Sequence, residues 1–220
     1  MTVPITRADV NYALQPSPWD LGNEVLYALC RDYPRHDRED AIIAKVWLIG
    51  RSYAAAIERR RDPRESSDDF YDKVVARKLR ESRLDQWLSS LPDRMADPWR
   101  QLGQVVAVHK RLIDLFAVIT DLEKRSLASK YLHFPRPDLF FLYDSRATAG
   151  ARNAVPLLGR IPRVQAAEAD PEYLKLVRRC QWIADEVAER FDTVLTPRQV
   201  DKILLRMAPR TRSTPDAPRV

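Results

Sequence analysis

The chain is organised around the stretch Arg125-Ser-Leu-Ala-Ser-Lys-Tyr-Leu-His-Phe-Pro-Arg-Pro-Asp-Leu-Phe-Phe-Leu-Tyr-Asp-Ser-Arg146. Its first part predicts a short helix over Ser126–Phe134, which ends at the Pro-x-Pro sequence 135–137. An apolar run from Leu139 to Tyr143 follows and stops at Asp144, a residue type that favours the N-cap of a new helix. The apolar segment indicates a buried junction between two helices. The acid at its end indicates that the carboxylate of Asp144 has a fixed direction and could face a functional site.

Length and composition set the first limits. With 220 residues and 45% hydrophobic content, the chain can bury a full core, as one domain or as two small lobes. The formal charge of +6 and the pI of about 9.4 favour anionic partners, with nucleic acid first among them. The 37 basic residues are interspersed with 31 acidic ones, so an ordinary mixed-charge surface explains the same composition.

Several functional classes are disfavoured by what the chain lacks. Cys30 and Cys180 lie far apart without a CxxC pair, which argues against a structural zinc or iron–sulfur site, so we expect no metal and no cofactor. No two of the five glycines lie close enough for a phosphate-binding loop. We see no signal-peptide pattern and no long apolar run, and we expect a cytoplasmic protein that does not bind membranes.

Apolar residues recur at helical spacing along most of the chain, and no alternating strand pattern exceeds a few residues. The sequence therefore predicts an all-α fold with about eight helices. We expect the first to begin at Trp19-Asp20 with Asp20 as N-cap, and a long one to run from Asp37 to about Arg61. The others are expected over about 69–91 after a cap at 66–69, 98–121, 126–134, 145–155, 171–191 and 197–207. Residues 1–18 are expected to be a loosely docked arm, and 208–220 a disordered basic tail.

The segments Ser126-Leu-Ala-Ser-Lys-Tyr-Leu-His-Phe134 and Phe141-Leu-Tyr-Asp144 together resemble the helix-hairpin-helix DNA glycosylase superfamily, and within it the 8-oxoguanine branch. In that family a hairpin ends in a lysine and opens a helix of the pattern K-x-A-S-x-x-L, and an apolar run then leads to an aspartate at the next helix start. The resemblance is specific over about 25 residues. It implies a two-lobed helical domain over residues 1–207 with a cleft between the lobes, and it places Asp144 at the catalytic aspartate.

The chain departs from this family at two points. Ser126 stands where a bifunctional glycosylase carries its nucleophilic lysine, and the hairpin 120–125 has no glycine pair. Excision of a base proceeds through an oxocarbenium-like state. The carboxylate of Asp144 could stabilise that cation or activate a water. A lysine nucleophile would have to come from Lys130, one helical turn past Ser126, or from Lys124. Asp144 and Lys130 are therefore the candidate catalytic residues.

A second set of residues is expected to contact the nucleic acid or the extruded base: Arg51, Tyr53, Ser126, Ser129, His133, Tyr143 and Arg146. Arg51 interrupts an apolar helical stripe, which indicates a buried or cleft-facing cation. Arg146 is a cation in a first helical turn, where the helix dipole disfavours it, so an acid or a phosphate should pair with it. Simpler roles explain the same residues: Asp144 as an ordinary N-cap, the aromatic residues as core, and His133 as a hydrogen-bonded link to the Pro-x-Pro turn. Arg51 would then be part of a charge pair within the fold, and Arg146 a solvated cation.

Three functions follow from these observations. The first is a glycosylase-like protein that binds nucleic acid, DNA rather than RNA, and excises a modified base; the resemblance suggests a bacterial accessory protein in defence against phage. The second is a catalytically inactive helical module that binds nucleic acid or a protein partner. The third is a helical protein whose cleft holds a small ligand such as a nucleotide or a free base.

Overall fold

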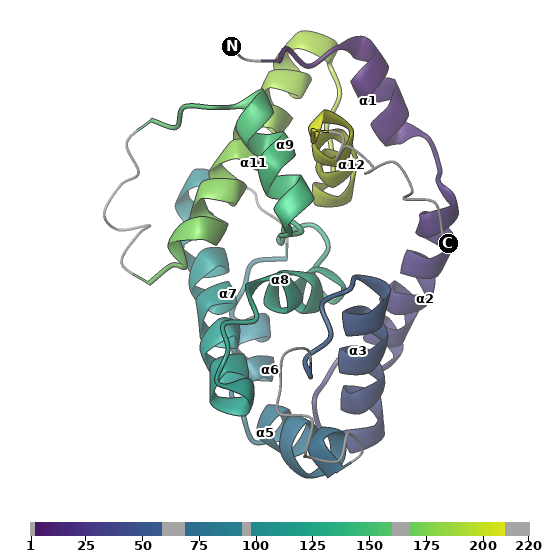
Figure 1. Ribbon diagram of the computed structural model, residues 1–220, viewed down its shortest axis with the longest axis vertical. Coiled ribbons are helices and arrows are strands. Elements are labelled where there is room, and N and C mark those ends of the chain that lie inside the picture. Colours follow the sequence, from purple (N-terminus) through teal and green to yellow (C-terminus); the bar gives the residue numbers. More distant parts are fainter. Residues whose placement is uncertain (1–2, 59–68, 94–97, 160–167, 210–220) are drawn as a thin grey trace, which may run out of the picture.

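A computed structural model describes residues 3–58, 69–93, 98–159 and 168–209 of the chain, with only the backbone of 98–100 (Figure 1). Within these residues the fold is all-α, as predicted, with ten α-helices, one π-helical segment and no strand. The elements are α1 (Arg7–Leu14), α2 (Pro18–Asp32), α3 (Glu39–Ser52), η1 (Phe70–Ala76), α5 (Arg77–Arg80), α6 (Leu84–Ser89), α7 (Pro98–Thr120), α8 (Arg125–His133), α9 (Ser145–Ala154), α11 (Pro171–Phe191) and α12 (Pro197–Met207).

The helices gather in two groups (Figure 1). At one end α12 packs on α9, α1 and α11, and at the other end α3 packs on α2, α8 and η1. The long helix α7 contacts α8 in the second group and α11 in the first. One cluster of buried apolar side chains runs through both groups, from Val10 and Ile203 to Ile42 and Leu79.

Three predicted helix starts are confirmed by their capping hydrogen bonds. Asp144 Oδ1 accepts from the Ala147 amide at 2.8 Å and begins α9. Asp170 Oδ1 accepts from the Tyr173 amide at 2.8 Å and begins α11. A reciprocal capping box around Thr196 begins α12. The helix expected over 126–134 is α8, displaced by one residue.

The expectation of a loosely docked N-terminal arm is wrong. Residues 7–14 form α1, which a capping box between Thr6 and Asp9 begins and whose Val10 and Ala13 are buried. The start of α2 also differs, because Ser17 is its N-cap and Pro18 its first residue. Asp20 is therefore not the N-cap; it lies in the first turn, where its carboxylate accepts from the Ser17 amide at 2.7 Å. The predicted tail is described only to residue 209.

The helix expected from Asp37 to Arg61 is shorter than predicted. It begins at Glu39 and ends at Ser52, where Ala54 takes a left-handed φ of 50°. The Ala54 amide donates to Arg51 O at 3.2 Å, and the Ala55 amide donates to Gly50 O at 2.7 Å. This pair of bonds is the Schellman pattern, which usually needs glycine at the left-handed position. Residues 59–61 lie outside the described residues.

The single helix expected over 69–91 is also wrong. The chain forms η1 and α5 and breaks at 81–83 before α6. The break is held by Ser82, whose hydroxyl donates to Leu79 O at 2.6 Å and accepts from the Leu84 amide at 3.2 Å. A serine that bonds the main chain on both sides competes with continuous helix. The expected cap at Ser66 lies outside the described residues.

None of the helices in the described ranges combines the length and the apolar character that crossing a bilayer requires.

Candidate functional site

A cavity of about 570 Å³ lies where three segments meet. Residues 53–56, after the end of α3, form one wall. Residues 122–127, the turn from α7 into α8, form the second, and residues 143–146, at the start of α9, form the third. Because α3 ends early, Tyr53 and the three alanines 54–56 border this cavity. The other two walls are formed by the starts of α8 and α9.

Asp144 is the N-cap of α9, and its side chain also borders the cavity. Its backbone is extended, with φ −156° and ψ 177°, as the N-cap of α9 requires. One carboxylate oxygen accepts from the Ala147 amide, yet the side chain remains 36% exposed and borders the cavity. The hydrogen bond from the Ala147 amide thus fixes the orientation of the Asp144 carboxylate, which still borders the cavity.

Lys130 lies under this carboxylate, with a side chain that is 1% exposed. Its Nζ donates to Ser126 Oγ at 2.8 Å and to Tyr143 O at 2.7 Å, and it lies 3.7 Å from Asp144 Oδ2. The prediction that Lys130 shares a helix face with Ser126 is confirmed. Burial lowers the pKa of Lys130, and the neighbouring carboxylates oppose that shift.

Ser129 has a structural position. It is fully buried, and its hydroxyl donates to Ser126 O and accepts from the Tyr143 amide, both at 2.9 Å. It thus ties α8 to the segment that precedes Asp144. Ser126 itself is half-buried and borders the cavity.

The aromatic residues divide between the cavity and the core. Tyr53 and Tyr143 border the cavity, and Lys130 Nζ lies 5.7 Å from the Tyr53 ring centroid. Tyr131 and Phe134, from the same aromatic-rich stretch as Tyr143, are buried and do not border it. They lie on the side of α8 that faces the hydrophobic cluster.

The two arginines of the predicted site lie in different places. Arg146 is exposed at the cavity and makes no hydrogen bond or ion pair with any residue the structure describes. Arg51 does not border the cavity, against the expectation of a cleft-facing cation. It lies in the exposed last turn of α3, where it pairs with Glu58 and stacks over Trp47. Arg51 follows the apolar positions of α3 in sequence, but it lies outside the core because the helix ends one residue later.

His133 is a structural residue, the simpler of the two roles considered. It is fully buried; its Nδ1 donates to Phe140 O at 2.8 Å, and its Nε2 accepts from Tyr27 Oη at 2.7 Å. Burial lowers the pKa of His133 to about 4, which keeps the ring neutral. It borders a second and larger cavity of about 1120 Å³, on the side of α8 away from Asp144.

Sequence analysis missed Asp201 in α12. It is 4% exposed, accepts from Arg198 Nη1 at 2.5 Å and interacts with the charges of Asp144 and Lys130. Burial raises the pKa of Asp201 to about 6. A signal was present, because Asp201 follows Val200 and lies four residues after the buried Pro197, on the buried face of α12.

Comparisons with models of protein families, with curated proteins and with solved structures found no match to this chain. The site is therefore interpreted from its own groups: a fixed carboxylate, a buried ammonium group, two tyrosine rings and one exposed arginine. No group of three or more His, Cys, Asp or Glu side chains in the described ranges could hold a metal ion.

Proposed function

We propose that the protein binds nucleic acid, DNA rather than RNA, at the 570 Å³ cavity and hydrolyses the N-glycosidic bond of a modified base there. The observation that carries this proposal is the carboxylate of Asp144. The first turn of α9 and the Lys130 ammonium group 3.7 Å away hold it at the mouth of a cavity bordered by tyrosines. An extruded base needs a pocket with aromatic walls, and Tyr53 and Tyr143 supply them.

Hydrolysis of the N-glycosidic bond requires a carboxylate for two tasks. When the bond from C1′ to the base breaks, the base leaves with the electron pair and takes a proton from solvent, and the sugar develops positive charge, which a fixed carboxylate stabilises. Water then adds to C1′, and the carboxylate takes the proton that this water loses. Asp144 Oδ1 is held by the Ala147 amide, so Oδ2 is the oxygen available for both tasks.

Lys130 acts on the carboxylate rather than on the sugar in this mechanism. Its Nζ is buried and donates to Ser126 Oγ and Tyr143 O. A nucleophile must reach C1′, and the Lys130 side chain is 1% exposed and does not border the cavity. Lys130 is therefore proposed as a positioning residue for Asp144, and hydrolysis as proceeding without a covalent intermediate.

The second candidate function is nucleic-acid or protein binding without excision. Ser126 at the position of the family lysine, and the N-cap role that occupies one oxygen of Asp144, favour it. Both functions use the same cavity. They differ in whether the protein excises a base with Asp144 or only binds its partner.

The decisive experiment compares the wild type with Asp144→Asn on duplexes that carry damaged bases. The proposal expects excision by the wild type, its loss in Asp144→Asn, and unchanged binding of both to an uncleavable duplex. Asp114→Asn, on the exposed face of α7, is the matched control and should excise normally. Binding without excision by the wild type would overturn the enzymatic proposal and leave the binding module. No binding of the duplexes would reject both excision and nucleic-acid binding, and would leave only a protein partner for the second function.

Borohydride trapping tests the role given to Lys130. We expect no covalent adduct between protein and DNA during excision. An adduct that Lys130→Met abolishes would instead make Lys130 the nucleophile.

The salt dependence of binding tests Arg146. Because this cation has no partner among the described residues, it is free to contact a phosphate. Arg146→Gln should reduce the slope of log K against log salt by about one. Arg111→Gln, whose side chain pairs with Glu168, should leave the slope unchanged.

A further inference from the structure

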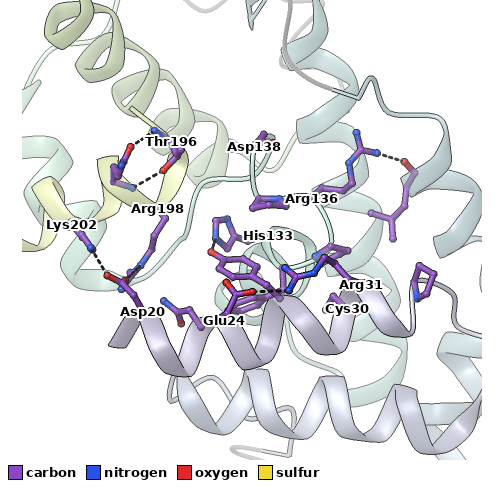
Figure 2. A pocket seen from close by; sticks show the side chains of 18 of the residues that line it. Asp20, Glu24, Cys30, Arg31, His133, Arg136, Asp138, Thr196, Arg198 and Lys202 are labelled. Atoms are coloured by element: carbon purple, nitrogen blue, oxygen red, sulfur yellow. Dashed lines mark hydrogen bonds and ion pairs between the residues drawn. The ribbon is translucent and has the colours of Figure 1, made fainter. Parts of the chain in front are cut away.

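The helices α2 and α3 form an antiparallel pair. They pack on each other, and Asn23 Oδ1, near the start of α2, accepts from Tyr53 Oη, just after the end of α3, at 2.7 Å. One side of α2 borders the larger cavity, where Glu24 and Arg31 form an ion pair (Figure 2). The side of the pair that faces away from the cavity is called the outer face below.

The outer face carries large apolar side chains in contact with solvent. Leu21 and Val25 of α2 are 78% and 60% exposed, and Trp47 of α3 is 46% exposed. Leu21 and Val25 do not border the larger cavity; each follows a residue that does, and so points about 100° away from it around the helix. The Arg51 guanidinium lies 5.9 Å from the Trp47 ring centroid. Tryptophan and arginine are common at the centres of protein interfaces.

Gly22 lies beside Val25 on this face, inside a helix of 15 residues. Its φ is not positive, and a Cβ added there would meet nothing within 4 Å. The described chain therefore gives no reason for glycine at this position, where alanine would favour the helix. A glycine lets a second backbone approach closely, so its presence indicates a helix from another molecule.

Asp32 indicates which molecule that is. This exposed carboxylate ends α2, near the negative end of the helix dipole, and makes no ion pair with a residue that the structure describes. When a copy of α2 is laid antiparallel on this face, the same carboxylate lies against the first turn, which begins at Pro18 and where the dipole is positive. The charges at the two ends of α2 thus complement those of a reversed copy, whereas nucleic acid would be repelled by Asp32.

We propose that the outer face is the interface of a homodimer in which α2 packs antiparallel on α2 of a second copy. The two α2–α3 pairs then form a four-helix bundle around a two-fold axis. Full overlap of the two α2 helices places this axis at Val25, the midpoint of Pro18–Asp32. Val25 meets its own counterpart there, and Gly22 lies one turn away, where the backbones come close. This inference does not depend on the function proposed for Asp144.

Sedimentation equilibrium over a wide range of protein concentrations tests the dimer. We expect the mass of the wild type to rise from monomer to dimer. Val25→Lys sets two ammonium groups against each other at the axis and should weaken association about hundredfold. Val118→Lys changes an equally apolar, exposed residue of α7 and should associate as the wild type does. A monomeric wild type, or a Val25→Lys protein that dimerises as tightly as the wild type, would overturn the proposal.

Oxidative crosslinking tests the position of the axis. Val25→Cys should form a disulfide-linked dimer, because the two cysteines face each other across the axis. Leu21→Cys is the matched control on the same face: it lies four residues from the axis, so its counterpart is about 12 Å away along the helix and out of reach. The native Cys30 and Cys180 are buried. Equal crosslinking of the two variants would contradict the antiparallel arrangement.

Gly22→Ala separates the interface from the fold. Alanine favours helix and its Cβ has open space within the monomer, so the variant monomer should resist urea slightly better than the wild type. The same Cβ keeps the two backbones apart and should weaken dimerisation about tenfold. A variant that dimerises as tightly as the wild type would show that α2 is not in close contact with a second copy at Gly22, and the proposed interface would be rejected.

Discussion

At the residue scale, a series of charges of alternating sign surrounds the buried Lys130 and Asp201. Lys130 interacts with both Asp144 and Asp201, Asp201 pairs with Arg198, and Arg198 approaches Asp20. A buried charge is costly when it is alone and tolerable when an opposite charge and hydrogen bonds surround it. This alternation explains how a lysine that is 1% exposed persists in the interior.

Three fully buried titrating groups predict how stability depends on pH. Burial lowers the pKa of His109 to about 3 and of His133 to about 4, and it raises the pKa of Asp201 to about 6. Near pH 5 both histidines are therefore protonated in the unfolded chain and neutral in the native protein. Asp201 is protonated in the native protein and ionised in the unfolded chain. The unfolded chain gains about one proton net, so the free energy of unfolding should fall by about 1.4 kcal/mol per pH unit on acidification.

Urea unfolding between pH 4.5 and 6.5 measures this slope. His133→Gln removes one of the two histidine contributions, and its slope should be nearly flat in that window. His109→Gln should flatten the slope similarly. A wild-type slope that persists in both variants would exclude these groups as the cause.

The local residue contacts could be predicted from the sequence, and the distant ones could not. Asp144 as N-cap and Lys130 beside Ser126 follow from spacings of three and four residues along a helix. Asp201 interacts with Lys130 across 71 positions of sequence, and no periodicity encodes that. Arg51 was misplaced because its environment depends on where α3 ends.

At the element scale, helix ends carry most of the departures from expectation. A left-handed alanine at position 54 ends α3, and a serine at 82 separates α5 from α6. Neither residue is a strong stop signal in sequence, since glycine and proline are the usual ones. The starts of α9, α11 and α12 were predictable because Asp, Thr and a following proline are standard cap signals.

The end of α11 offers a stabilising substitution. Its C-cap, Asp192, has φ 50° and places a carboxylate at the negative end of the helix dipole. Asp192→Gly removes both the backbone strain and the repulsion, and it should raise the free energy of unfolding by about 1 kcal/mol. Asp192→Ala removes only the charge and should gain less. Equal gains in urea unfolding would show that the left-handed backbone costs nothing here.

The contact between α9 and α12 depends on Gly150. A Cβ added there would lie 1.9 Å from Leu204 O, which is main chain and cannot move aside. Gly150→Ala should therefore destabilise the protein by about 2–3 kcal/mol, although alanine favours helix. Gly103→Ala is the control: nothing lies within 4 Å of its added Cβ, and it should stabilise α7 slightly. Thermal melts that rank the two variants alike would contradict this view of the contact.

At the scale of the whole molecule, the two groups of helices share one hydrophobic cluster. The resemblance implied one domain with two lobes over residues 1–207, and this stays a prediction. A continuous core should unfold as one cooperative unit. Methyl NMR during urea unfolding can follow Ile203 in one group and Ile42 in the other. Coincident midpoints are expected, and separated midpoints would instead define two domains.

The early end of α3 has one more consequence. The aperture beside Asp144 exists because two main-chain hydrogen bonds turn the chain after Ser52, leaving Ala54, Ala55 and Ala56 on its rim. Bulkier side chains at those three alanines would narrow the entrance while the backbone that creates it stayed in place. The width of the opening thus depends on these three side chains, independently of the Asp144 carboxylate at its edge.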